Sequence, residues 1–177
     1  MSGRARGRRV ALATAAVTVV ACALVLPATA TVHPRGKLTQ KAKVASVVDG
    51  DTINVVLRGK TEPVRFIGID TPEVYPAKDC GGPEASASMN QMLKTGDRVR
   101  LIRDRSQGNR DIYDRLLRYV ELKGKDLGRK QVGRGWAETF VYDRPLARLG
   151  GYRKKQKRAR RQDRGVWGQC PHGFPPP

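Results

Sequence analysis

Two short stretches constrain the fold most, because each joins an apolar run of β-strand type to a group of carboxylates. Residues 44–48 lead into Asp49-Gly50-Asp51-Thr52, and residues 64–69 lead into Asp70-Thr71-Pro72-Glu73, with Arg65 inside the second run. Four carboxylates and an arginine therefore fall within twenty-five residues. A sheet holds side chains at strand ends in fixed geometry. The two stretches predict a single site at the edge of a small β structure.

Further short runs predict five strands with a helix between the third and the fourth. The strands are expected at residues 42–48, 52–57, 63–69, 98–103 and 116–122, with a hairpin turn at Asp49-Gly50-Asp51. Pro83 followed by Glu84 is typical of a helix start and predicts a helix over 83–94. Weaker helices are expected at 127–136, which contains three glycines, and at 145–164, interrupted at Gly150-Gly151. The pattern indicates a mostly β chain of the α+β class and fits a small closed barrel.

A third stretch, residues 111–120, brings Tyr113 and Arg115 to the start of the fifth strand. The motifs D-G-D-T, R-x-x-x-x-D-T-P-E, G-P-E-A-S and Y-x-R, in this order and spacing, resemble the staphylococcal nuclease (thermonuclease) family over residues 41–167. The resemblance implies an OB-fold, a five-stranded barrel with about three flanking helices, in a domain at residues 41–170. It also implies an endonuclease that hydrolyses DNA and RNA with little sequence specificity and leaves 3′-phosphate ends.

The carboxylates of the two motifs suit a metal site. Asp51 and Asp70 are hard oxygen ligands of the kind that hold Ca²⁺ or Mg²⁺. The resemblance adds the backbone carbonyl of Thr71 as a third ligand, places Asp49 beside the metal, and favours Ca²⁺. The alternative for Asp49-Gly50 is an ordinary hairpin turn.

The catalytic roles are also implied by the resemblance. It assigns Arg65 and Arg115 to the phosphate, which suits their planar guanidinium forks, and it makes Glu73 the candidate general base. Each of these three residues also has a structural alternative. Glu73 could cap the following turn. The two arginines could form surface ion pairs, with Asp111 or Asp114 as the partner of Arg115. Asp114 stands where the family commonly has glycine and brings a negative charge close to Arg115.

Aromatic and basic residues predict contact with nucleic acid. The resemblance makes Tyr113 a nucleotide contact, and Phe140 or Tyr142 supplies a stacking ring, which holds bases without reading sequence. For Phe140 the alternative is packing in the core. The basic run at residues 154–161 is either a solvated helix face or an added attraction for phosphates.

The charge of the chain favours a polyanionic partner. The formal net charge is +19 and the pI is near 10.7, which points to DNA and RNA as substrate. Two other functions remain open: a non-catalytic nucleic-acid-binding module on the same barrel, and a protein that binds polyanions at cell surfaces. Nothing in the sequence requires more than a monomer.

The N-terminal residues have the layout of a secretory signal peptide. Four arginines precede an apolar run and the small residues Ala28-Thr29-Ala30, which predicts cleavage after residue 30, a linker at 31–40 and a secreted protein. The cleaved chain has a net charge of +15, from 31 basic and 16 acidic side chains. The alternatives are an uncleaved anchor or lipid attachment at Cys22, either of which would hold the protein at the outer face of a membrane.

Removal of that segment leaves two cysteines, Cys80 and Cys170. An even pair in an exported chain suggests a disulfide, which would tie the C-terminal part to the loop before the first helix. Residues 171–177 are expected to form a disordered tail.

Overall fold

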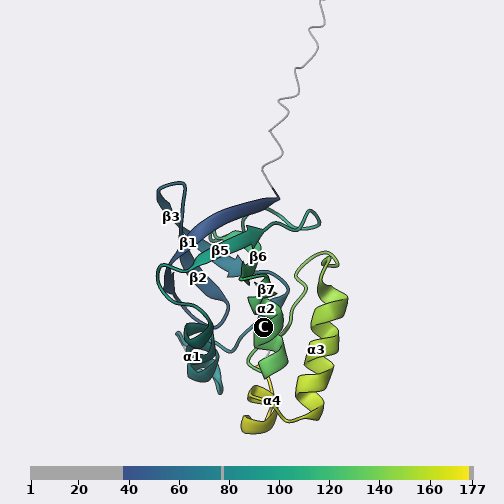
Figure 1. Ribbon diagram of the computed structural model, residues 1–177. Coiled ribbons are helices and arrows are strands. Elements are labelled where there is room, and N and C mark those ends of the chain that lie inside the picture. The colour runs from purple at the N-terminus through teal and green to yellow at the C-terminus, as the bar shows by residue number, and fades with distance from the viewer. Residues whose placement is uncertain (1–37, 77, 176–177) are drawn as a thin grey trace, which may run out of the picture. The chain divides into compact units, whose positions relative to one another are not determined.

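The computed structural model describes residues 38–76 and 78–175, and a closed β-barrel is its main feature (Figure 1). Five strands form the barrel: β1 (Thr39–Val47), β2 (Thr52–Leu57), β3 (Lys60–Phe66), β5 (Arg98–Ile102) and β6 (Leu116–Leu122). Their hydrogen-bonded order is β3-β2-β1-β5-β6, all antiparallel, and a parallel pairing of β3 with β6 closes the sheet. The predicted five-stranded barrel of the α+β class is confirmed, and it is consistent with the OB-fold.

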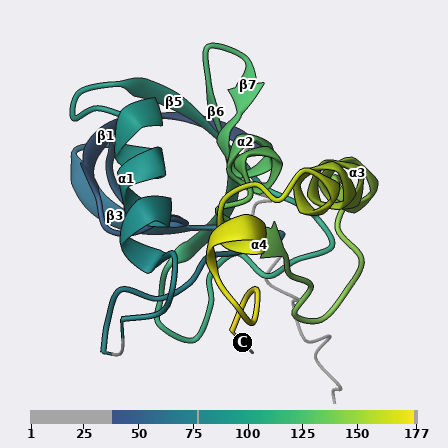
Figure 2. The ribbon, with the colours of Figure 1, turned by 90° about the horizontal axis from the view of Figure 1, so that it is seen from below.

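Four helices accompany the barrel: α1 (Gly82–Met92), α2 (Leu127–Arg134), α3 (Leu149–Arg161) and the short α4 (Val166–Gln169). Figure 2 shows α1 over the end of the barrel, whereas α2, α3 and α4 lie together beside it. The three longer helices confirm the predicted number. The short pair β6–β7, where β7 is Lys125–Asp126, leads directly into α2.

Alternation along the strands fills the barrel with apolar side chains. Ala42 and Val44 of β1 and Ile53 and Val55 of β2 are buried, and the intervening positions are more exposed wherever the sheet faces solvent. The period of two places residues i and i+2 on one face of a strand. Each fully buried aliphatic side chain contributes about 1.5–3 kcal/mol, so this inner face, with Phe66, supplies the main stabilisation.

The predicted third strand, 63–69, is wrong at its C-terminal end. β3 ends at Phe66, and Gly68 takes a positive φ of 82° that L side chains rarely adopt. A separate strand, β4 (Ile69–Asp70), then pairs with β8 (Glu138–Thr139) outside the barrel. The break at Gly68 therefore turns the chain and presents Asp70 beside β8.

The predicted last helix also differs from the structure. α3 begins at Leu149 rather than at residue 145 and is continuous, because Gly150 and Gly151 lie in its first turn. The uncertain helix at 127–136 is confirmed as α2. Beyond α3, Val166 is buried, and the rings of Trp167 and Phe174 lie 4.7 Å apart between centroids.

The predicted signal segment at 1–30, with Cys22, and residues 31–37 of the predicted linker lie outside the described residues. β1 begins at Thr39, three residues before the predicted first strand and within the predicted linker. The part of the chain that is described contains no helix long and apolar enough to cross a membrane.

Candidate active site

The turn between β1 and β2 fixes Asp51 next to Thr71. Asp49 Oδ1 accepts hydrogen bonds from the backbone N–H groups of Asp51 at 2.9 Å and Thr52 at 2.7 Å, so the Asp49 side chain closes the turn. A Cβ on Gly50 would lie 2.8 Å from the Thr71 side chain. Only glycine allows this close approach. The turn thus has the structural role expected of an Asp-Gly pair and also positions a carboxylate.

Asp51 is only 4% exposed, and both of its carboxylate oxygens have partners. Oδ2 accepts from the Thr71 N–H at 2.9 Å and from the Thr71 hydroxyl at 3.0 Å. Oδ1 accepts from the Thr52 hydroxyl at 3.1 Å and lies 3.1 Å from Nε of Arg65. These bonds hold the carboxylate at one position and in one orientation.

Arg65, on β3, lies between Asp51 and Asp70 and uses every edge of its guanidinium. Its Nε faces Asp51, its Nη2 pairs with Asp70 Oδ1, and its Nη1 donates to the carbonyl oxygens of Phe66 at 2.9 Å and Ile69 at 2.8 Å. The strand and the β3–β4 connection therefore hold this fork rigidly between two carboxylates.

Negative charge exceeds positive charge in this cluster. Burial raises the pKa of Asp51 to about 7; the charge of Arg65 opposes the rise, and repulsion from Asp49 and Asp70 adds to it. Burial also raises the pKa of Asp70, again against the effect of Arg65. Burial of Arg65 favours its neutral form, but attraction to Asp51 and Asp70 outweighs this and raises its pKa. With Asp49 and Glu73, four carboxylates act on one partly buried guanidinium.

Glu73 lies at the exposed rim of the cluster. Partial desolvation of its carboxylate, followed by repulsion from Asp49 and Asp70, raises its pKa. Its backbone is held by Asp79, whose Oδ2 accepts from the Glu73 N–H at 3.0 Å and whose own N–H donates to the Glu73 carbonyl at 3.0 Å. The Glu73 side chain is thus anchored through its main chain and remains open to solvent.

Arg115 extends from a loop that Asp111 organises. Asp111 Oδ2 accepts from Arg115 Nε at 2.7 Å, so Asp111 is the ion-pair partner among the two that the sequence allowed. Asp114 instead lies 3.4 Å from Nε of Arg110 and is 86% exposed at its side chain, with a φ of 61°. Burial raises the pKa of Asp70, and the charge of Arg115, after that of Arg65, opposes this rise.

Comparison with known proteins identifies the family to which the chain belongs. A family model described as staphylococcal nuclease homologue matches residues 63–169, which include Arg65, Asp70, Glu73 and Arg115. The chain belongs to the staphylococcal nuclease family. It is 34% identical to the thermonuclease of Staphylococcus hyicus over 132 residues, which cover 72% of this chain and 76% of that protein.

Two Bacillus subtilis proteins are similar to this staphylococcal nuclease homologue over 123 residues, or 68% of the chain. Identity is 31% with endonuclease YncB and 32% with the SPbeta prophage-derived endonuclease YokF. The chain spans 58% of YncB and 41% of YokF. Both relatives are therefore substantially longer than the region they share with it.

The predicted aromatic contacts of this nuclease homologue lie on two segments. Tyr113 is 72% exposed, and the guanidinium carbon of Arg115 lies 5.2 Å from the centroid of its ring. Phe140 follows β8, and its N–H donates to the Gly68 carbonyl at 3.2 Å, beside the connection that leads to Asp70. Tyr142 is largely exposed, with its ring centroid 6.4 Å from that of Phe140. The hydrogen bonds and ion pairs described for the carboxylate cluster do not involve these rings.

Two residues near the site of this staphylococcal nuclease homologue carry no sequence motif. Glu138 on β8 lies opposite Asp70 on β4, and burial followed by repulsion from Asp70 raises its pKa. Gln131 on α2 is fully buried, and its Nε2 donates to the Gly50 carbonyl at 3.2 Å. Only the β4–β8 pairing reveals Glu138. For Gln131, the available signal in the sequence was its position as a polar residue on the face of α2 that is otherwise buried.

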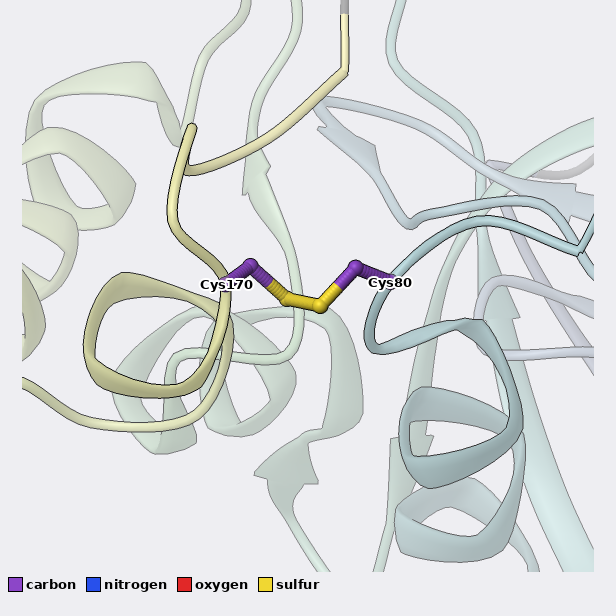
Figure 3. The surroundings of a disulfide bond; sticks show 2 residues. All are labelled: Cys80 and Cys170. Atoms are coloured by element: carbon purple, nitrogen blue, oxygen red, sulfur yellow. A yellow bond between two sulfur atoms is a disulfide. The ribbon is translucent and has the colours of Figure 1, made fainter.

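The predicted disulfide between Cys80 and Cys170 is present (Figure 3). Cys80 belongs to the loop between Glu73 and α1, and Cys170 follows α4, 90 residues later, with their Cα atoms 5.9 Å apart. In this family member the bond therefore ties the segment that carries Glu73 to the C-terminal end of the domain.

Proposed function

We propose that this protein is a metal-dependent endonuclease that hydrolyses phosphodiester bonds of DNA and RNA with little sequence preference. The observation that carries the proposal is the partly buried Arg65 between Asp51 and Asp70, with Glu73 at the open rim. A phosphodiester is anionic and resists attack by water, so its hydrolysis needs positive charge at the phosphate and an oriented base. The names of the related thermonuclease and endonucleases support the same chemistry.

Asp51, Asp70 and the carbonyl oxygen of Thr71 fit a divalent cation. They are hard oxygen donors, and a cation would offset both the burial of Asp51, which is the main cause of its raised pKa, and the added repulsion from Asp49 and Asp70. Residues 38–76 and 78–175 hold no group of three or more His, Cys, Asp or Glu side chains that would enclose a metal. Water and phosphate oxygens would therefore complete the ligand set. We propose Ca²⁺ rather than Mg²⁺, because Ca²⁺ accepts such flexible oxygen sets.

When bound, the cation neutralises phosphate charge and makes an attached water more acidic. Arg115 uses only Nε in the hydrogen bonds described, so its two terminal nitrogens are available for a bidentate phosphate contact. Arg65, held by its carboxylates and carbonyls, stabilises charge on the phosphate oxygens. Glu73 accepts the proton of the attacking water, and its raised pKa makes it a stronger base near neutral pH.

The proposal extends to substrate and product. Cleavage releases the 5′ oxygen and leaves 3′-phosphate ends. Exposed Tyr113 and Tyr142, with Phe140, stack on bases, which favours no particular sequence. The net charge of +19 supports a polyanionic substrate.

We further propose that the protein acts outside the cell as a monomer, after removal of residues 1–30. The disulfide between Cys80 and Cys170 supports export, because such bonds persist in oxidising compartments. Retention at the outer face of a membrane, through the N-terminal segment or a lipid on Cys22, is the alternative.

The test is digestion of single-stranded and plasmid DNA and of RNA by the purified protein with Ca²⁺, with Mg²⁺ and with chelator. Glu73→Gln and Arg115→Ala are compared with Glu84→Gln, which removes an exposed carboxylate at the start of α1. We expect cleavage that requires metal, falls at least about 100-fold in the first two variants, and persists in the third. Binding without cleavage under every condition would instead identify a nucleic-acid-binding module.

A further inference from the structure

We propose that α3 and β8 form a second nucleic-acid contact surface, which binds substrate phosphates outside the catalytic cluster. The surface is a groove, here called the basic groove, lined by Thr139, Arg153, Gln156, Lys157, Arg160 and Arg161. Four of these six side chains are cationic, and the other two are polar. A groove of this composition suits a polyanion.

All charged side chains of α3 are basic. Seven of its thirteen residues are Lys or Arg, and none is acidic. No ion pair found among the described residues involves a side chain of α3. A helix with so many cations and no internal counter-charge is stabilised when an external anion approaches it.

The basic side chains of the groove follow one row of the helix. Arg153, Lys157 and Arg160 are at positions i, i+4 and i+7, which lie on one face, and all three are exposed. With a rise of about 1.5 Å per residue, they are separated by about 6 Å and about 4.5 Å along the helix axis. A row of cations at these intervals can meet successive phosphates of one strand.

The basic groove adjoins the strand pair β4–β8, which also carries Asp70 of the catalytic cluster. Gln156 Oε1 accepts from the Thr139 N–H at 2.7 Å and from the Thr139 hydroxyl, which joins α3 to β8. Thr139 lies opposite Ile69, and the next pair in this ladder is Glu138 with Asp70. The groove therefore begins about one strand spacing, roughly 4.8 Å, from the backbone that carries Asp70.

This adjacency favours a nucleic-acid strand as the ligand. A surface for anionic membranes has no need to adjoin the carboxylates, whereas a strand whose phosphate is bound by Arg115 in the catalytic cluster can pass beside β8 when it extends past the site. The inference rests on the proposed nuclease function for the position of the strand. Binding, however, can be measured without cleavage.

The test compares two double variants that differ only in the row of α3 that they neutralise. Arg153→Gln with Lys157→Gln removes two cations of the basic groove, and Lys154→Gln with Arg158→Gln removes one Lys and one Arg at the same spacing from exposed positions outside it. Both are made with Glu73→Gln, so that DNA stays intact. Binding of a fluorescent 20-nucleotide strand and of a trinucleotide is titrated with Ca²⁺ at several salt concentrations, and circular dichroism confirms folding.

We expect the groove variant to bind the 20-nucleotide strand more weakly. Each single-strand phosphate contact contributes about 0.7 to the magnitude of the slope of log K against log salt, so the loss of two contacts should reduce this magnitude by about 1.4. Trinucleotide binding should change less than binding of the 20-nucleotide strand, because the shorter strand carries fewer phosphates past the site. The control variant should change the slope by less than half as much. Equal slopes in the two variants would overturn the inference, since net charge alone would then explain the effect.

Vesicles with 30% phosphatidylserine provide the remaining comparison. Loss of vesicle binding in the groove variant, with affinity for the 20-nucleotide strand intact, would also overturn the inference and assign the surface to membranes. If the protein with Glu73 intact cuts no nucleic acid but the slopes differ as expected, the proposed nuclease function fails and the contact surface stands.

Discussion

Glu73 and Asp79 are joined by two hydrogen bonds, one from the Glu73 N–H to Asp79 Oδ2 and one from the Asp79 N–H to the Glu73 carbonyl, both 3.0 Å long. The first depends on the Asp79 side chain. Asp79→Ala removes it and leaves the Glu73 side chain unchanged. At about 1 kcal/mol for one hydrogen bond, we expect about a five-fold loss of kcat.

Asp79→Asn retains an acceptor for the Glu73 N–H and should keep most of the activity. If the negative charge of Asp79 were what mattered, Asp79→Asn would lose as much activity as Asp79→Ala. The measurement is kcat on single-stranded DNA at saturating Ca²⁺, together with the thermal midpoint of each variant. An unchanged kcat in Asp79→Ala would show that the loop positions Glu73 without this bond.

The disulfide should contribute strongly to stability because it closes a long loop. Cys80 and Cys170 are 90 residues apart, for which the chain-entropy model gives about 4–5 kcal/mol. We expect the double variant Cys80→Ser with Cys170→Ser to lose about that free energy of unfolding in urea titrations. Reductant should lower the stability of the native protein toward that of the variant and leave the variant itself unchanged. A loss below about 1 kcal/mol would show that the loop is already constrained without the bond.

Local sequence patterns sufficed to predict the elements that depend on nearby residues. The hairpin turn was predictable because Asp49 bonds to N–H groups only two and three residues away. Strands β2 and β6 have the predicted limits, since alternating apolar side chains define them without reference to partners. The cluster of Arg65 with Asp51 and Asp70 was predicted from the two carboxylate motifs, although Arg65 lies on β3 and Asp70 on the separate strand β4.

The parts that could not be predicted depend on pairing between distant segments. β8 has two residues, and only its pairing with β4 brings Glu138 opposite Asp70. The continuous α3 contradicts the expected break at Gly150-Gly151, because packing of Tyr152 and Ala159 against the body outweighs the low helix propensity of two glycines in the first turn. Gln131 is held by partners on α1 and in the β1–β2 turn, which no single window of sequence contains.

Asp104 should make stability depend on pH at the acidic end. Burial of Asp104 disfavours its charged form. Hydrogen bonds to its carboxylate outweigh this effect and lower the pKa of Asp104. The donors are the hydroxyl of Tyr119, the N–H of Ala147, and the N–H and hydroxyl of Ser106. A pKa that is lower in the folded state stabilises the protein above the unfolded value of about 3.9, and this stabilisation is lost as the pH falls through the folded value.

We therefore expect Asp104→Asn to be less stable than the native protein by about 2 kcal/mol at pH 7, with the difference narrowing as the pH falls below about 4. Urea unfolding at pH 3, 5 and 7 measures this. A difference that stays constant over the three pH values would assign the effect to packing rather than to charge.

Gln131 should support activity as well as stability, because its Nε2 donates to the carbonyl of Gly50, between Asp49 and Asp51. Gln131→Leu removes the donor to the Gly50 and Ala85 carbonyls and the acceptor of the Ser88 hydroxyl, and we expect a loss of about 2 kcal/mol in the free energy of unfolding. We also expect kcat to fall at temperatures where the variant is fully folded. Ser88→Ala is the control, because it removes the bond at Oε1 and leaves Gly50 bound. Equal losses of kcat in the two variants would mean that Gln131 does not act through the turn.

Asp114 occupies a position where the backbone has a positive φ of 61°, which glycine adopts without strain. Its carboxylate is 86% exposed and lies near Arg110, while Arg115 pairs with Asp111. An exposed pair of this kind contributes at most about 1 kcal/mol, so we expect Asp114→Gly to keep kcat/KM within about twofold and to change the free energy of unfolding by less than about 1 kcal/mol. Asp111→Ala, which removes the acceptor of Arg115 Nε, should lower kcat/KM about tenfold or more. A large rise of kcat/KM in Asp114→Gly would show instead that the charge of Asp114 weakens phosphate binding by Arg115.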